Sequence, residues 1–259
     1  KCYIWVLVNK AERVVIFFYD NGSRGRDVLT DFIGDAELKS IMSDGYNAYT
    51  FIGNELKTAD TPNFSKTEHQ VCLAHARAKF VKASEQACDK NADIFIKYIE
   101  DLYNLERQYT KDGLTDEERG KQRQSLETKG ILINLRTHLG IEKAKDPATV
   151  TPYLQKALNY LDIFWANIFT YIKDGSYPID NNAAERAVRP LTTQRNSMLH
   201  FGSDEGAKMA ATYHSIISTV KLQGRSAWDY LGKFFVNIFN GCRDFFSLRP
   251  GNIELAPCQ

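Results

Sequence analysis

Two runs of β-branched and aromatic residues open the chain and constrain its fold more than any other feature. The first covers Tyr3 to Val8, and the second covers Val14 to Tyr19, just before a turn signal at 20–23. Two such runs with a short polar connection predict an antiparallel hairpin of buried strands. Apolar residues at helical spacing from Arg26 to Phe32 then predict a helix that stops at Gly34.

Two shorter apolar segments predict further strands. Lys39 to Ser43 runs directly into Asp44, which we expect to lie at the carboxyl end of a strand. The segment 70–73 is the second, and a helix is predicted after it over 74–87. The order strand, strand, helix, strand, strand, helix is typical of a mixed α/β fold.

From residue 88 onward the pattern becomes helical. Apolar residues recur at helical spacing over 94–109 and 154–168, which predicts an all-helical insertion. Further helices are expected over 182–188, 205–222 and 228–239. We therefore divide the chain into an N-terminal α/β part (1–87), a helical insertion (88–175), a second helical part (176–222) and a C-terminal helix with a tail (223–259).

Composition excludes several classes of protein. With 43% hydrophobic and 25% charged residues, the chain is globular rather than disordered. Five scattered cysteines do not form a disulfide framework and fit a reducing cytoplasm. No signal peptide is visible in these 259 residues, and no apolar stretch is long enough to span a membrane, so no membrane partner is expected. The net charge of +1 does not by itself indicate a nucleic-acid binder.

Two carboxylates are candidate catalytic residues. Asp44 is expected at a strand end, where active-site groups gather, although Asp-Gly is also a common turn. Glu185 lies three residues after Asn182, which is the spacing of a capping box, and four before Arg189, so a structural role explains it equally well. Together, a strand-end Asp and a helix-borne Glu could hold Mg²⁺, which supports phosphoryl transfer on a nucleic-acid backbone.

Cys72 and His75 form a lone Cys-x-x-His motif, with His69 nearby. A structural zinc site needs four ligands, usually as two paired clusters, and the sequence has no second cluster. We therefore expect His75 at the edge of the active site or hydrogen-bonded in the core.

Basic residues gather in three segments: Arg77, Lys79 and Lys82; Arg186, Arg189 and Arg195; and Lys221, Arg225, Lys233, Arg243 and Arg249. The candidate DNA-contacting residues are Arg77, Lys79, Arg186, Arg189 and Arg195. Such residues can contact DNA phosphates without reading sequence. Solvated helix faces and ion pairs account for at least half of the basic residues in such patches.

Three motifs resemble the insertion-sequence-66 family of bacterial transposases. They are Ser43 to Tyr49 (SDGYNAY), Cys72 to Phe80 (CLAHARAKF) and Asp180 to Pro190 (DNNAAERAVRP). The resemblance covers essentially the whole chain, in the same order as in the family. The third motif is long and specific, whereas Asp-Gly-Tyr alone is weak.

The resemblance implies a DDE transposase with an RNase H-like mixed sheet and a helical insertion before the last acidic residue. It assigns Asp44 to the second acidic position and Glu185 to the third, as ligands of Mg²⁺ or Mn²⁺, with His75, Asn181 and Asn182 supporting the edge of the site. It also implies transposon-end and target DNA as partners, a homo-oligomer in the full-length transpososome, and a bacterial cytoplasmic protein associated with the nucleoid.

The family's first acidic position has no counterpart in this sequence. We expect it before Cys2, so that the sheet lacks its first strand and this chain alone is inactive in joining DNA. Asp20 also ends a predicted strand, but it begins an Asp-Asn-Gly turn and is a weaker candidate. The alternatives are a non-catalytic truncated remnant that binds DNA or full-length transposase, and an RNase H-like nuclease.

Overall fold

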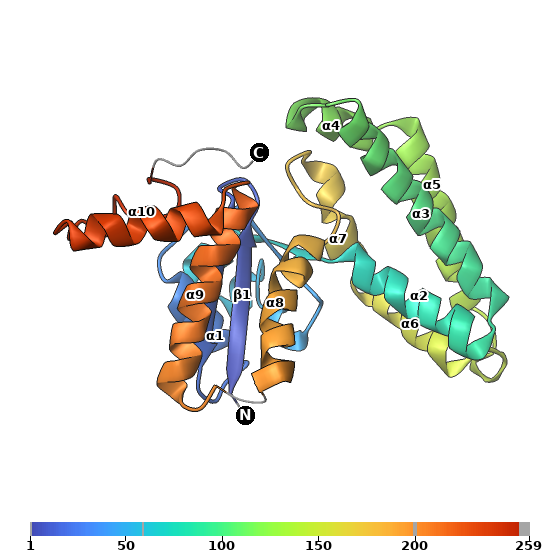
Figure 1. Ribbon diagram of the computed structural model, residues 1–259. Coiled ribbons are helices and arrows are strands. Elements are labelled where there is room, and N and C mark those ends of the chain that lie inside the picture. The colour runs from blue at the N-terminus through green and yellow to red at the C-terminus, as the bar shows by residue number, and fades with distance from the viewer. Residues whose placement is uncertain (1, 59, 199–200, 254–259) are drawn as a thin grey trace. The chain divides into compact units, whose positions relative to one another are not determined.

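The computed structural model describes residues 2–58, 60–198 and 201–253 and divides the chain into two compact units (Figure 1). The first unit combines Lys1–Val28 with Asn182–Gln259, and the second is Leu29–Asn181. The four-part division expected from the sequence stays a prediction. No helix of the described residues is long and apolar enough to cross a lipid bilayer.

The first unit is built on an antiparallel hairpin, as the sequence predicts. Strands β1 (Tyr3–Asn9) and β2 (Val14–Asp20) pair with Val6 opposite Phe17. Two helices, α8 (Asn182–Met198) and α9 (Asp204–Leu222), bury apolar residues against the hairpin in a small core that includes Phe17, Leu191 and Ala211. A further helix, α10 (Ala227–Phe239), buries Tyr230 against Val220 of α9.

Helix α8 is longer than expected, because it continues through Pro190 to Met198 instead of ending near Val188. Proline costs a helix one backbone hydrogen bond and usually breaks it. Here Leu191 directly after the proline is buried in the hairpin core, and this packing favours continuation of the helix.

Hydroxyl groups of α9 cover the backbone of β2. The Thr219 hydroxyl accepts the Val15 N–H and donates to the Val15 C=O, both at 3.0 Å. One helical turn earlier, the Ser215 hydroxyl makes the same pair of bonds with Phe17, at 2.7 and 3.1 Å. An exposed strand edge is a site of aggregation, and these side chains satisfy its polar groups within the unit.

Replacing Thr219 by valine is expected to destabilise the protein by about 1–3 kcal/mol, because it leaves the buried N–H and C=O of Val15 without partners. The measurement is urea unfolding followed by circular dichroism. Thr212→Val, at an exposed position of the same helix, is the matched control and should leave the midpoint unchanged. Equal midpoints for both variants would contradict the role given to Thr219.

The second unit joins a short parallel strand pair to a group of helices. Strand β3 (Ser40–Ser43) pairs with β4 (Glu68–Val71), Ser43 opposite Val71. The α-helices with residues in this unit are α1 (Arg26–Ile33, which begins in the first unit), α2 (Leu73–Ala87), α3 (Lys90–Lys111), α4 (Asp116–Arg123), α5 (Leu126–Lys143), α6 (Pro152–Ile163) and α7 (Trp165–Ile168). Short 3₁₀ helices cover Asn47–Tyr49, Glu55–Lys57, Pro62–Phe64, Pro147–Thr149 and Phe169–Lys173.

The core of this unit lies among α2, α3, α5 and α6, and α2 and α6 lie side by side in Figure 1. At its centre the rings of Phe80 and Phe95 stack with centroids 4.5 Å apart. The mixed α/β class is confirmed, and the helical content expected after residue 88 is present. The described strands form two separate pairs instead of one mixed sheet, and the RNase H-like arrangement stays a prediction.

Candidate active site

Asp44 lies at the carboxyl edge of the parallel pair β3–β4. Strand β3 ends at Ser43, so the prediction that Asp44 directly follows a strand is confirmed. The Cys72 N–H donates to the Ser43 carbonyl at 3.0 Å, which extends the pairing of the strands by one residue. Asp44 directly follows β3 and Cys72 directly follows β4, so both lie at the carboxyl edge of the strand pair. Functional groups of open α/β sheets gather at this edge.

A buried histidine fixes the end of β3. The Ser43 hydroxyl and His69 Nε2 lie 2.8 Å apart, and both side chains are buried. Burial lowers the pKa of His69 to about 4, so this imidazole is neutral at physiological pH. Ser43, the residue before Asp44, therefore forms a hydrogen bond with a neutral histidine of the neighbouring strand β4.

Asp44 also makes the turn that its sequence suggests. Its Oδ1 accepts the Tyr46 N–H at 2.9 Å, and the intervening Gly45 has a φ of +80°, which favours glycine. The side chain is half-buried. A turn and a functional carboxylate are compatible here, because the local hydrogen bond orients the carboxylate.

The segment 179–181 lies beside the N-terminus of α2. The Ile179 carbonyl accepts the Leu73 N–H at 3.3 Å, and the Asn181 N–H donates to Cys72 Sγ at 3.3 Å. These bonds place the half-buried Asn181 at the edge that carries Asp44, and its supporting role in the site stays a prediction. His75, in the first turn of α2, is half-buried and lies on the same short segment as Cys72.

Asp180 is a carboxylate that sequence reasoning did not single out. Burial raises the pKa of the Cys72 thiol, and the charge of Asp180 adds to this effect. Burial likewise raises the pKa of the Tyr103 phenol, with Asp180 again contributing. The position of Asp180 directly before Asn181 was the signal available in the sequence, but a motif does not say which of its acidic residues faces a buried thiol.

Glu185 lies in the first turn of α8 and is exposed. Asn182 is the first residue of that helix and is half-buried. Glu185 belongs to the first compact unit and Asp44 to the second, so their joint site stays a prediction. Among the described residues, no group of three or more His, Cys, Asp or Glu side chains is placed to hold a metal ion.

The five predicted DNA-contacting residues fall on two helices. Arg186, Arg189 and Arg195 are exposed on α8. On α2, the exposed Lys79 ammonium lies 4.6 Å from the centre of the Tyr160 ring, and Arg77 Nε lies 3.8 Å from a Glu100 carboxylate oxygen. Arg77 therefore has an ion-pair partner within the protein, while Lys79 is exposed and lies over the ring of Tyr160.

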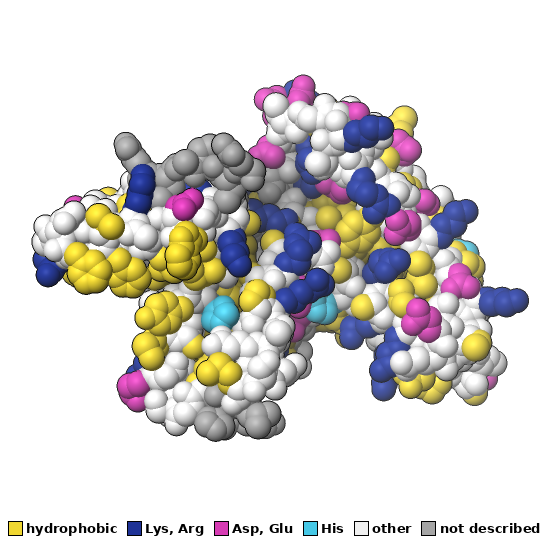
Figure 2. All heavy atoms as spheres, viewed as in Figure 1, with side chains coloured by type: hydrophobic (Ala, Val, Ile, Leu, Met, Phe, Trp, Pro, Cys, Tyr) yellow, Lys and Arg dark blue, Asp and Glu magenta, His cyan; other side chains and the backbone are white. Residues whose placement is uncertain are grey.

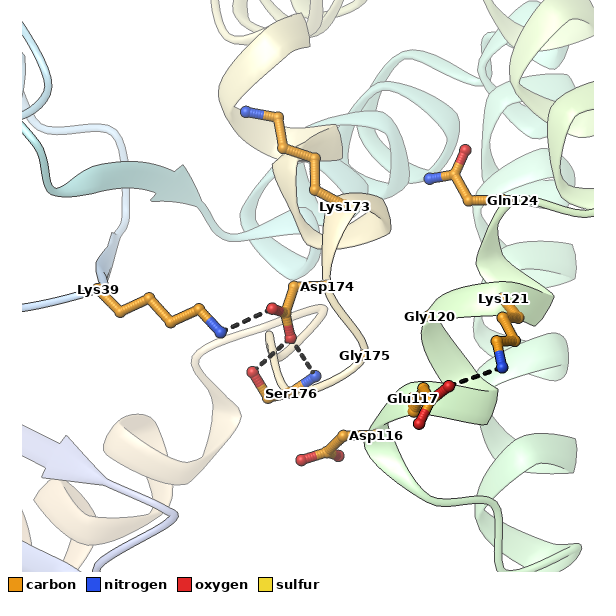
Figure 3. Close-up of a pocket in the computed structure, with 10 residues that line it drawn as sticks. All are labelled: Lys39, Asp116, Glu117, Gly120, Lys121, Gln124, Lys173, Asp174, Gly175 and Ser176. Carbon is orange, nitrogen blue, oxygen red and sulfur yellow. Dashed lines mark hydrogen bonds and ion pairs between the residues drawn. The ribbon is translucent and has the colours of Figure 1, made fainter.

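A cavity of about 700 Å³ lies elsewhere in the second unit (Figure 3). It is lined by Lys39, which precedes β3, and by residues of α4 and the segment 173–176. Lys39 pairs with Asp174 at 2.6 Å, and this contact, together with hydrogen bonds from Ser176, lowers the pKa of the Asp174 carboxyl to about 2. The cavity contains none of the predicted site residues, and its position at the opposite end of β3 separates it from Asp44.

Comparison with known proteins identifies the family. The family model described as "Transposase IS66 family" matches residues 1–209. This chain belongs to the IS66 family of transposases. The match includes all three motifs and every candidate residue named above, so the resemblance expected from the sequence is confirmed.

Curated relatives of the chain come from Sinorhizobium fredii and carry the description "uncharacterized protein". One, y4jD, is 25% identical over 205 residues, which are 78% of this chain and 38% of that protein. Another, y4qI, is 26% identical over 245 residues, which are 93% of this chain and 43% of that protein. The chain thus spans about two-fifths of the length of these relatives. No solved structure matches the chain.

Proposed function

We propose that this chain carries part of the catalytic core of a DDE-type DNA transposase, which cleaves transposon ends and joins them to target DNA. Membership of a transposase family supports the reaction class. The single structural observation that supports it best is the placement of Asp44 directly after β3, on the edge shared with Cys72 and Asn181. A strand end of this kind aims a carboxylate at a substrate outside the sheet.

In this proposal Asp44 and Glu185 bind Mg²⁺ or Mn²⁺. The fit is one of donor chemistry: both are carboxylates, Asp44 is half-buried and oriented by its own turn, and Glu185 is exposed in a first helical turn. Mg²⁺ keeps several waters and commonly takes only one or two protein carboxylates. When bound, the metal supplies activation of the attacking oxygen and stabilisation of the leaving oxygen.

The basic residues then position DNA. Arg186, Arg189 and Arg195 extend from the helix that bears Glu185, and Lys79 extends from the helix that follows Cys72. Cations beside the acidic residues would contact phosphates and offset the repulsion between DNA and carboxylates. His75, Asn181 and Asn182 would line the edge of the site without taking part in bond making.

Self-association is part of the same proposal. Helix α10 exposes large aromatic side chains, including Trp228 at 84% and Phe239 at 83% of their surface, and Figure 2 shows hydrophobic side chains along this helix. Contiguous exposed apolar residues of this size are typical of an interaction surface. A homo-oligomer in the assembled transposase would use such a surface.

The experiment is a joining assay with pre-cut transposon-end DNA, a target plasmid and Mg²⁺. Because the chain spans only about two-fifths of the length of its curated relatives, the assay uses the longest available protein that contains residues 1–259. Glu185→Gln is expected to lower joining by about a hundredfold or more, since it removes a metal-binding charge. Glu205→Gln, in the first turn of α9, is the matched control and should join normally.

Two outcomes would count against the proposal. Wild-type joining by Glu185→Gln would remove Glu185 from the site. Cleavage of branched DNA without joining would favour the RNase H-like nuclease. For the chain 1–259 alone we expect no joining at any Mg²⁺ concentration.

A further inference from the structure

A tyrosine of the helical insertion holds the backbone of Asp44. The Tyr160 hydroxyl, on α6, donates to the Asp44 carbonyl at 2.8 Å, although the two residues are 116 positions apart. Both residues belong to the same compact unit, so this contact lies within one body. The helical insertion therefore touches the predicted catalytic loop directly.

The next residue of the loop is pressed against the same helix. A Cβ added at Gly45 would lie 3.0 Å from the Tyr160 hydroxyl and 3.1 Å from Cε2 of Phe164. These distances are tighter than most Cβ contacts, so a side chain at position 45 would displace Tyr160, Phe164 or the loop by a few tenths of an ångström. The positive φ of Gly45, +80°, independently favours glycine.

Tyr160 itself is held in place and remains a donor. The centroid of its ring lies 5.0 Å from the centroid of the Phe164 ring. The Nζ atom of Lys79 lies 4.6 Å from the same Tyr160 centroid. Burial raises the pKa of its phenol, and the charges of Cys72 and Asp44 add to this. The phenol therefore keeps its proton at neutral pH and can donate to the Asp44 carbonyl.

These contacts restrict Asp44 from two directions. Its carbonyl is bound by Tyr160, and its Oδ1 is bound by the Tyr46 N–H, so both the backbone and one carboxylate oxygen have fixed partners. We propose that Tyr160 is a positioning residue, through which the helical insertion sets the direction of the Asp44 carboxylate. This inference rests on the proposed function, in which that carboxylate binds a divalent metal.

The test compares Tyr160→Phe with Tyr153→Phe in the chain 1–259. Both variants delete one phenol hydroxyl from α6, and each ring has a lysine above it, Lys79 for Tyr160 and Lys82 for Tyr153. Only the first removes a bond to the loop. Two quantities are measured. The first is the rate of amide hydrogen exchange at residues 45–46. The second is the affinity for Mn²⁺, obtained from the electron paramagnetic resonance signal of the unbound ion.

For Tyr160→Phe we expect hydrogen exchange at 45–46 to be about two- to tenfold faster, the size of one lost hydrogen bond. We expect Mn²⁺ affinity to fall about tenfold, as when a group that orients a ligand is removed. Gly45→Ala keeps the hydroxyl but forces the loop from α6, and should weaken Mn²⁺ binding similarly. Tyr153→Phe should match wild type in both measurements.

The results separate this inference from the proposed function. If Asp44→Asn loses Mn²⁺ binding while Tyr160→Phe binds and exchanges like wild type, the positioning role is overturned and the metal site stands. If wild type and Asp44→Asn bind Mn²⁺ equally, the metal role of Asp44 fails, and the inference that rests on it fails with it. A merely structural role of Tyr160 would lower the melting temperature without weakening Mn²⁺ binding in the folded protein, which also overturns the proposal.

Discussion

Asp44→Asn is expected to reduce DNA joining by about a thousandfold or more, the largest effect of any substitution considered. Asparagine keeps the Oδ1 that accepts the Tyr46 N–H, so the turn after β3 should survive. It removes the negative charge that binds the metal. The loss should therefore appear in joining and in Mn²⁺ binding, while the melting temperature stays close to that of wild type.

Asp20→Asn is the matched control for this variant. Asp20 ends β2, and its Oδ1 accepts the Ser23 N–H at 2.8 Å, so it combines a strand end with a local turn as Asp44 does. We expect normal joining from Asp20→Asn, because its carboxylate is explained by that turn. Loss of joining in Asp20→Asn, with Asp44→Asn active, would reverse the assignment.

Arg123→Met is expected to lower the free energy of unfolding by about 3–5 kcal/mol, because it removes the buried cation of Glu106, which keeps only its pair with Arg119, and leaves three backbone carbonyls without this donor. Arg123 is 2% exposed, and two of its guanidinium nitrogens donate to Glu106 at 2.7 and 2.8 Å. The third donates to the carbonyls of Tyr171, Asp174 and Tyr177. These carbonyls belong to the segment that leads to 179–181, so the loss should also loosen the chain beside α2.

Thermal and urea unfolding measure this effect, with Lys121→Met as the control on the same helix. Lys121 pairs with Glu117 at the surface, and solvent screens that pair, so its loss should leave the melting temperature unchanged. Adding Glu106→Leu to Arg123→Met should restore part of the stability, because it removes a buried carboxylate that has lost its buried cation, while Arg119 keeps its hydrogen bond to Thr110. If Arg123→Met has the same melting temperature as wild type, the contacts of Arg123 with Glu106 and with the segment 171–177 do not stabilise the protein.

Residues of two helices, α4 and α6, contact the segments around Asp44. Arg123 of α4 binds the segment 171–177, and Tyr160 of α6 binds Asp44. Both contacts lie in the unit Leu29–Asn181, and they act on the two stretches of chain that meet at the N-terminus of α2. The helices α4 and α6 of this unit therefore contact the segments that surround Asp44.

Local chemistry made several elements predictable. The hairpin, the strand before Asp44 and the helical character after residue 88 follow from apolar residues recurring at strand or helix spacing, and the observed bounds of β1, β2, β3, α9 and α10 lie close to those expected. The family could also be predicted, since the motif at 180–190 is long and specific. Pro190 was misleading, because the burial of Leu191 offsets the local cost of the proline and α8 continues past it.

The sequence by itself determined which segments become strands and helices, and which acidic residue follows a strand, because these depend on neighbours within a few positions. Only the tertiary structure decided which distant groups hold those elements. Ser215 and Thr219 bind the backbone of β2, and Tyr160 binds that of Asp44, over separations of 198, 204 and 116 residues. A hydroxyl carries no local signal of the backbone it will bind, since that partner is set by how helices pack after the chain has folded.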